Sequence, residues 1–220
     1  MEFYVHLEKV FMFEVIVVRN LAEALRVKGS SVFELVHHTF YERDFIFFAR
    51  LTAHLSKITG CDEKDAMEFG KLSELLYLSS LLHFSLTEVT ENTEQLRAEK
   101  QMPVLLGDLL YGRFITALTE SGKTAYLPIY LAYLKHFNVD GVDALEGRIA
   151  YTMDDAAALL TEKTAEVMAL FTECAVEKVL AEANVYLRDH WEGLRGEKIS
   201  SFAVLEALLQ KEFSQGAMVC

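Results

Sequence analysis

Hydrophobic residues along this chain recur every three or four positions rather than every second one, which is the spacing of amphipathic helices. The periodic stretches are long, and the breaks between them often coincide with one of the few glycines. The pattern predicts helices over residues 2–27, 31–58, 62–86, 103–120, 124–137, 141–150, 153–190 and 200–213. The fold class that follows is all-α.

The segment 62–86 is apolar on almost every side. It begins beside Asp62, a residue type that caps helix N-termini. Its second half carries large apolar side chains, namely Leu75, Leu76, Tyr77, Leu78, Leu81 and Leu82. Because a helix that is apolar all round is a buried helix, we expect this segment to lie in the core.

The segment 103–120 combines apolar residues with two glycines and one charge. Pro103 suits a first helical turn, so we expect the helix to begin there. Gly107 and Gly112 each cost about 1 kcal/mol relative to alanine inside a helix, which indicates close helix packing or a partner surface. Asp108 is costly in apolar surroundings unless paired. We therefore expect it to contact a cation or a helix terminus, in this chain or across a subunit boundary.

The segment 153–190 begins with a helix-start signal. Thr152 stands three residues before Asp155, which is the spacing of a capping box. Asp154 and Asp155 are adjacent, but no third acid follows four residues later. We therefore interpret them as acids that favour the start of a helix rather than as metal ligands.

Length and composition fit a single domain. The 220 residues are 52% hydrophobic, which is enough for one substantial core. We expect one helical bundle over 1–220, with an N-terminal helix in 1–30, a core in 31–190, and a C-terminal helix and tail in 191–220. The apolar stretch 10–18 is interrupted by Glu14 and is too short to span a membrane, so we expect a buried helix there.

The charge balance argues against two kinds of partner. A net charge of -12, with 21 lysines and arginines that form no cluster, argues against nucleic acid and against docking to anionic lipid. Three widely spaced cysteines, Cys61, Cys174 and Cys220, suggest neither a disulfide framework nor a zinc site. We expect a cytoplasmic protein with reduced thiols.

Five short motifs occur in an ordered series. They are SSLLHFSLTE at 79–88, Arg97, VLLGDLLYGRF at 104–114, LEGRIA at 145–150 and EKTAEVMALF at 162–171. In order and approximate spacing they resemble the H-D-D-x-x-D, R-R-G, V-L-L-G-D-x-L, E-G-E and K-T-A signatures of the trans-isoprenyl diphosphate synthases. The resemblance covers residues 50–175 and implies the all-helical fold of that family.

The chain departs from that family where metal and diphosphate would bind. The family's three aspartates hold Mg²⁺ against the allylic diphosphate, whereas this chain has Phe84, Ser85 and Glu88 there. The family's G-K-R segment is reduced to Arg43, and Arg97 has no arginine neighbour. No second D-D-x-x-D motif follows, so we expect a bundle truncated at its C-terminus.

These losses resemble the small, non-catalytic subunits of two-component synthases that make the hexaprenyl or heptaprenyl tail of menaquinone. The resemblance implies a catalytic partner that carries both aspartate motifs and binds Mg²⁺, the allylic diphosphate and isopentenyl diphosphate. This chain would bind no metal or cofactor itself, and it would support the partner's activity and set product length.

The resemblance also implies roles for individual residues. Those expected near a diphosphate are Arg43, Arg97 and Lys163. Those expected at the subunit interface are Leu106, Gly107, Asp108, Tyr111, Gly112 and Phe114. The helix over Val104 to Leu118 that carries them, and its neighbour over 124–137, are expected to contact the partner subunit. Those expected to set chain length are Tyr77, Leu78, Leu81 and Leu82.

Other interpretations remain open for several of these positions. His83 fits a core histidine better than a ligand, and Lys163 fits a charged helix face as well as a diphosphate contact. Glu88, Glu91 and Glu94 fit a solvated acidic turn, but they also permit an autonomous prenyltransferase with a glutamate metal site. A helical adaptor that keeps the fold is the third alternative. Four further histidines, at 37, 38, 136 and 190, lack metal-ligand spacing and are expected to be structural.

Overall fold

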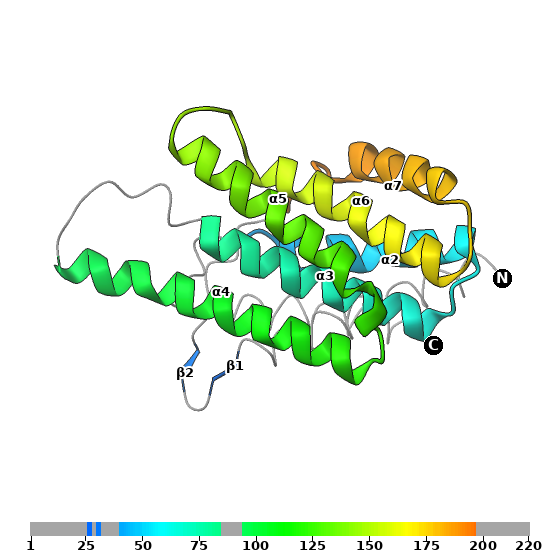
Figure 1. The fold of residues 1–220 in the computed structure, drawn as a ribbon, viewed down its shortest axis with the longest axis horizontal. Helices are drawn as coiled ribbons and strands as arrows, with labels where there is room; N and C mark the ends of the chain where they lie inside the picture. The colour runs from blue at the N-terminus through cyan, green and yellow to red at the C-terminus, as the bar shows by residue number, and fades with distance from the viewer. Residues whose placement is uncertain (1–25, 28–29, 32–39, 85–93, 197–220) are drawn as a thin grey trace.

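The computed structural model describes residues 26–27, 30–31, 40–84 and 94–196, and within them the fold is helical, as predicted (Figure 1). The α-helices are α2 (Phe47–Thr59), α3 (Glu63–Phe84), α4 (Glu94–Glu120), α5 (Leu127–Leu145), α6 (Met153–Phe171) and α7 (Val176–His190). Two short 3-10 helices, η3 (Glu42–Phe45) and η5 (Thr124–Tyr126), precede α2 and α5. A two-residue antiparallel pair joins β1 (Arg26–Val27) to β2 (Ser30–Ser31).

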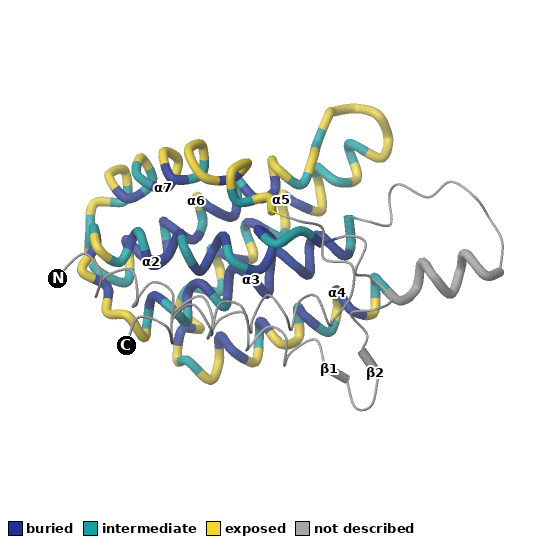
Figure 2. Tube along the Cα trace, turned by 180° about the vertical axis from the view of Figure 1, so that it is seen from behind, coloured by how far each residue is buried: buried dark blue, intermediate teal, exposed yellow. Residues whose placement is uncertain are grey.

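Helix α3 lies at the centre of the bundle. It packs against α2, α4 and α6, and every residue from Leu72 through Leu82 is buried (Figure 2). Asp62 accepts a hydrogen bond from the backbone N–H of Asp65 at 2.8 Å, which is the capping contact expected at this end. The predicted core helix is therefore confirmed.

Helix α2 begins later than the segment predicted over 31–58. Tyr41 is extended, and residues Glu42–Phe45 form the short helix η3. Helix α2 starts only at Phe47, after Ile46. The side chain of Ile46 does not cap it. The cap comes instead from Glu74 of α3, whose Oε1 accepts a hydrogen bond from Phe48 N–H at 2.9 Å. A buried side chain of another helix thus fixes the start of α2.

Helix α4 begins at Glu94, and the prediction that it starts at Pro103 is wrong. The nine residues before Pro103 are mostly strong helix formers, and they continue the helix N-terminally. Proline in a helix interior removes a backbone hydrogen bond, which is why the sequence pattern favoured a helix start at this position. Arg97, expected in a loop, therefore lies on α4.

Two further predicted boundaries are wrong. Helix α5 runs through Gly141 to Leu145, so 124–137 and 141–150 do not form separate helices. The segment predicted as one helix over 153–190 is broken at Glu173, which has φ 55°. There Cys174 N–H bonds Ala169 O at 2.9 Å and Glu173 N–H bonds Leu170 O at 3.4 Å, the pattern of a Schellman helix end. Helix α7 then folds back on α6.

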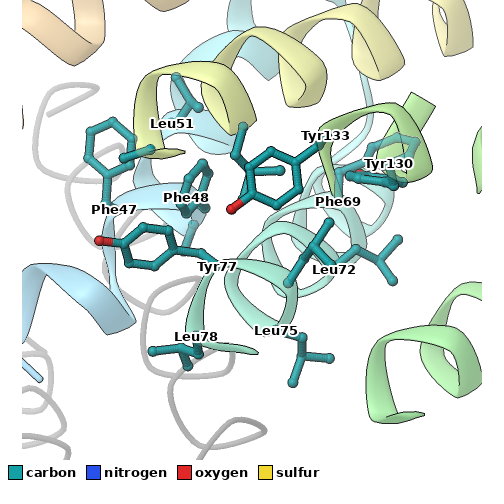
Figure 3. Packing of buried hydrophobic residues seen from close by; sticks show 14 of the residues in the cluster. Phe47, Phe48, Leu51, Phe69, Leu72, Leu75, Tyr77, Leu78, Tyr130 and Tyr133 are labelled. Atoms are coloured by element: carbon teal, nitrogen blue, oxygen red, sulfur yellow. The ribbon is translucent and has the colours of Figure 1, made fainter. Parts of the chain in front are cut away.

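Aromatic side chains fill the core between the helices (Figure 3). Phe48 packs on Tyr77 with ring centroids 5.5 Å apart, and Phe114 of α4 meets Tyr130 of α5 at 5.3 Å. The helices predicted over 2–27 and 200–213 fall mainly outside the described residues, although residues 26–27 lie in β1 rather than in a helix. Among the described helices, none combines the length and apolarity needed to cross a membrane.

Candidate functional site

The glycine and aspartate of the VLLGD motif lie against the last turn of α3. A Cβ added to Gly107 would overlap the imidazole of His83, and Gly107 O accepts a hydrogen bond from Ser79 Oγ at 2.8 Å. The close packing expected of this glycine is therefore present within the chain. Asp108 Oδ1 stands 3.4 Å from His83 Nε2, so the two groups pair when the imidazole is protonated. The side chain of Asp108 is 66% exposed, so it bears no burial cost.

The six residues expected at a subunit interface divide between the core and the surface. Leu106 and Phe114 are buried in the chain's own core. Tyr111 is half-buried and stacks on Phe114 at 6.0 Å, whereas Asp108 and Gly112 are exposed. A Cβ on Gly112 would meet nothing within 4 Å. Of these residues, only Asp108, Tyr111 and Gly112 present a surface to a partner.

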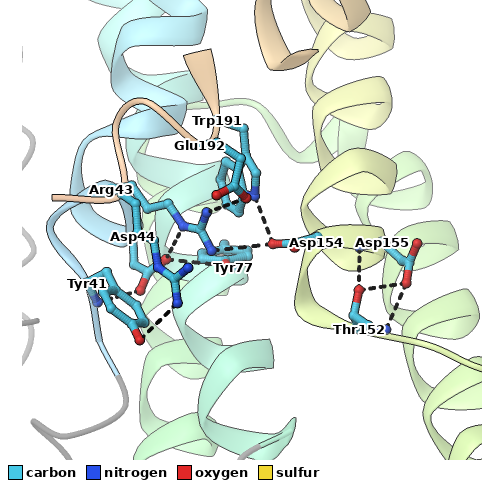
Figure 4. A network of polar contacts seen from close by, with 10 residues as sticks. Tyr41, Arg43, Asp44, Tyr77, Thr152, Asp154, Asp155, Trp191 and Glu192 are labelled. Carbon is cyan, nitrogen blue, oxygen red and sulfur yellow. Dashed lines mark hydrogen bonds and ion pairs between the residues drawn. The ribbon is translucent and has the colours of Figure 1, made fainter. Parts of the chain in front are cut away.

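A cluster of charged and aromatic side chains, the Arg43 cluster, joins η3 to the start of α6 and to the turn after α7 (Figure 4). It comprises Arg43 and Asp44 of η3, Asp154 of α6, and Trp191 and Glu192 of the turn after α7. The Arg43 guanidinium is 3.3 Å from both the Asp154 and the Glu192 carboxylates, and its Cζ lies 4.2 Å from the Trp191 ring. Arg43, predicted as a diphosphate contact, is thus held by acids of its own chain.

Asp44 is the buried acid of this cluster. Its carboxylate accepts hydrogen bonds from Tyr41 N–H at 2.7 Å and from the Tyr77 hydroxyl at 3.4 Å. Burial raises the pKa of Asp44 to about 6, although these hydrogen bonds and the charge of Arg43 act in the opposite direction. Asp44 therefore changes charge in a range where ordinary aspartates are already ionised.

Trp191 joins the Arg43 cluster to the hydrophobic core. Its ring packs edge-on against Phe47 at 4.7 Å and against Tyr77 at 5.9 Å. Its indole Nε1–H donates to Asp154 Oδ1 at 2.8 Å. The sequence interpretation gave no role to Trp191 or Glu192 and treated Asp154 only as a helix-start acid. The signal that could have drawn attention to this position is that Trp191 is the single tryptophan of the chain.

Lys163, the other predicted diphosphate contact whose side chain the structure describes, does not join this cluster. Lys163 donates to Glu166 Oε2 at 2.8 Å on the same face of α6, which is the charged-helix-face alternative. It lies nine residues after Asp154, or about 13 Å further along the helix axis. Arg97 lies near the start of α4. The structure therefore does not bring Arg43 and Lys163 together.

The four residues expected to set chain length all face the packed core. Leu78 and Leu82 are fully buried, and Tyr77 and Leu81 nearly so. Tyr77 fills the space between Phe48, Trp191 and Asp44. These positions thus support the fold of this chain, and their role in product length stays a prediction.

Glu74 is a buried acid that the sequence interpretation missed. It is fully buried in α3, and burial raises the pKa of its carboxyl well above the ordinary value. The backbone N–H groups of Phe48 and Ala49 oppose that shift by donating hydrogen bonds. The signal that could have identified it is an acid in the apolar second half of α3.

A small charged pocket of about 230 Å³ lies between α3 and the end of α4, away from the Arg43 cluster. Its lining contains three lysines and three acids, together with Ala117 and Ser121. The buried Lys123 pairs with Asp65 and lies 5.0 Å and 5.1 Å from the rings of Phe69 and Phe171. Its charge is therefore already balanced within the chain.

The described residues contain no group of three or more histidine, cysteine or acidic side chains arranged to hold a metal. His136 and His190 bond the backbone carbonyls of Ala132 and Tyr186. Glu88, Glu91, His37 and His38 lie outside the described residues. The chain matches no family model, and no curated protein or solved structure is significantly similar to it.

Proposed function

We propose that this chain is the non-catalytic subunit, component I, of a two-component heptaprenyl or hexaprenyl diphosphate synthase. It would pair with a partner that carries the D-D-x-x-D motifs and, with Mg²⁺, ionises the allylic diphosphate and adds isopentenyl units. This chain would stabilise the active partner and set product length. The proposal rests first on the ordered motifs between residues 50 and 175.

One structural observation carries the non-catalytic part of the proposal. Both described cations that the resemblance places near a diphosphate are paired with acids of the same chain, Arg43 with Asp154 and Glu192, and Lys163 with Glu166. A catalytic site would need such cations, together with bound Mg²⁺, to face the departing diphosphate. The pairs inside this chain instead favour a structural role for Arg43 and Lys163.

Exposed apolar side chains on α4 and α5 favour association with a partner. Leu105 is 60% exposed on the same helix as the exposed Asp108 and Gly112. Helix α5 exposes Leu131, Val139, Val142 and Leu145. Exposed apolar side chains thus recur along α5, whereas Leu105 is the single large one described on α4. The proposed partner surface therefore combines the outer sides of α4 and α5.

The test is a reconstitution with a D-D-x-x-D protein encoded beside this chain. Each protein is purified alone and then mixed, and products formed from farnesyl diphosphate, isopentenyl diphosphate and Mg²⁺ are separated by length. We expect turnover only from the mixture, with products of six or seven isoprene units.

Two results would contradict the proposal. Turnover by this chain alone would favour the autonomous prenyltransferase. A partner that forms no complex with the chain and has the same rate and product length without it would favour the helical adaptor.

A further inference from the structure

Helix α5 carries a line of mostly apolar side chains along one side. The helix runs along the outside of the bundle, and Tyr130, Tyr133 and Phe137 bury its inner side in the core (Figure 1). The line, which we call the α5 stripe, consists of Leu131, Leu134, Asn138, Val142 and Leu145. At about 3.6 residues per turn, these positions span roughly 80° of the helix circumference. They therefore form one narrow surface along the helix.

The α5 stripe is open to solvent over most of its length. Leu131, Val142 and Leu145 are 42%, 50% and 60% exposed. Asn138 is also exposed, and Leu134 is half-buried. Exposed apolar side chains that are contiguous on a surface are typical of sites of association. Because the stripe is narrow and follows the helix axis, it suits a second helix that packs lengthwise against α5.

The order of residues in the α5 stripe is symmetric about Asn138. Leu134 and Val142 stand four positions before and after Asn138, and Leu131 and Leu145 stand seven positions before and after it. Across a two-fold axis, residue i of one copy meets residue j of the other, and j meets i. In an antiparallel pair of α5 helices with Asn138 on the axis, Leu131 would lie opposite the second copy's Leu145, and Leu134 opposite its Val142. The symmetry of the stripe thus matches a second copy of the same helix.

The charges beside the α5 stripe are also complementary between two copies. The exposed Lys135 stands three positions before Asn138, whereas Asp143 and Glu146 stand five and eight positions after it. In the antiparallel pair, the lysine of each copy lies about 3 Å and about 8 Å along the axis from these two acids of the other copy. Arg148 pairs with both acids of its own chain, so that end of α5 keeps a net negative charge. Opposite charges across an interface favour one register over others.

From the symmetry and the charges we infer that the α5 stripe is a self-association surface, on which a second copy of this chain packs antiparallel with Asn138 on the two-fold axis. One pair of helices buries less area than a large specific interface, so the dimer is weak and reversible. The central Asn138 fixes the register at a cost in affinity. The inference does not rest on the proposed function. A catalytic partner that uses the outer sides of α4 and α5 would compete with the second copy for α5.

Sedimentation equilibrium of the full-length chain, over about a hundredfold range of concentration, measures this pairing. We expect a monomer–dimer equilibrium. Val142→Glu places a charge in the α5 stripe and should weaken the dimer at least about tenfold. Asn138→Leu removes the central polar group and should strengthen the dimer about tenfold. The matched control is Val185→Glu on α7, where valine is 41% exposed, and it should pair as the wild type does.

An exchange of charges tests the antiparallel register. Lys135→Glu and Glu146→Lys should each weaken the dimer about threefold, because like charges then face each other, and the double variant should restore it. Circular dichroism should show all variants equally folded. A chain that stays monomeric at every concentration would overturn the inference, as would a dimer that Val142→Glu leaves intact or that the double variant fails to restore. These measurements need no partner, so their failure is distinct from failure of the reconstitution.

Discussion

Gly107 of α4 lies directly against the imidazole of His83 in the last turn of α3. The contact explains why glycine is present in the middle of a long helix, where it costs about 1 kcal/mol relative to alanine. The hydrogen bond from Ser79 to the Gly107 carbonyl reinforces the same approach. The VLLGD motif therefore has a packing role within this chain that does not depend on catalysis.

Replacing Gly107 tests this packing. Gly107→Ala places a methyl group where the His83 ring lies, so we expect a loss of about 1–3 kcal/mol in the free energy of unfolding, measured by urea titration. Gly112→Ala is the matched control, because it lies in the same helix with open space around it. There alanine should stabilise the protein by about 0.5–1 kcal/mol. Equal effects at both positions would contradict the packing role.

Glu74 should be needed as a hydrogen-bond acceptor rather than as a charge. Glu74→Gln keeps an oxygen for the N–H of Phe48, so we expect it to change the free energy of unfolding by less than about 1 kcal/mol. Glu74→Ala leaves that N–H buried without its acceptor and creates a cavity, which should cost about 2–4 kcal/mol. Thermal and urea unfolding measure both. If glutamine were as damaging as alanine, a buried charge would have to be the stabilising element.

Asp44 should make stability depend on pH. Its pKa is about 6 in the folded protein against 3.8 ordinarily, so the folded state retains a proton that the unfolded state has released. Stability from this group is complete below about pH 4 and falls as pH rises towards 6, by on the order of 3 kcal/mol in all. Asp44→Asn cannot titrate. The unfolding free energy of the wild type, relative to this variant, should therefore decrease between pH 4 and 7, and a constant difference would show that Asp44 has an ordinary pKa.

The partner surface is tested at Leu105. Because this side chain is exposed in the isolated chain, Leu105→Lys should leave its thermal stability unchanged. If α4 meets the catalytic partner, burying the new charge should weaken the complex at least about fivefold, as measured by calorimetry. Val185→Lys on α7, where valine is 41% exposed, is the control and should bind normally. Equal affinity for both variants would place the interface elsewhere.

Local patterns in the sequence predicted much of the fold. The spacing of apolar residues identified α3 as the core helix, and Thr152 with Asp155 identified the start of α6, where the capping box is present. The errors occurred where the local signal was misleading or absent. Pro103 suggested a helix start that neighbouring helix-forming residues override, and Glu173 occupies a left-handed helix end at which glycine is usual.

The candidate site was less accessible to sequence analysis. Arg43 was identified from a motif, but its partner Glu192 lies 149 residues away along the chain. No periodicity or local spacing relates residues so far apart, because their contact depends on how α2, α6 and α7 pack. For the same reason Trp191 attracted no interpretation, although it lies at the centre of the cluster.

The sequence by itself determined that the chain is helical and which helix is buried, since these depend on side-chain type and on spacing within one helix. The tertiary structure alone decided that Gly107 packs against His83 and that Glu74 caps α2. It also decided that Glu192 and Asp154 form ion pairs with Arg43. Those contacts join separate helices, and only the packing of the bundle brings their side chains within bonding distance.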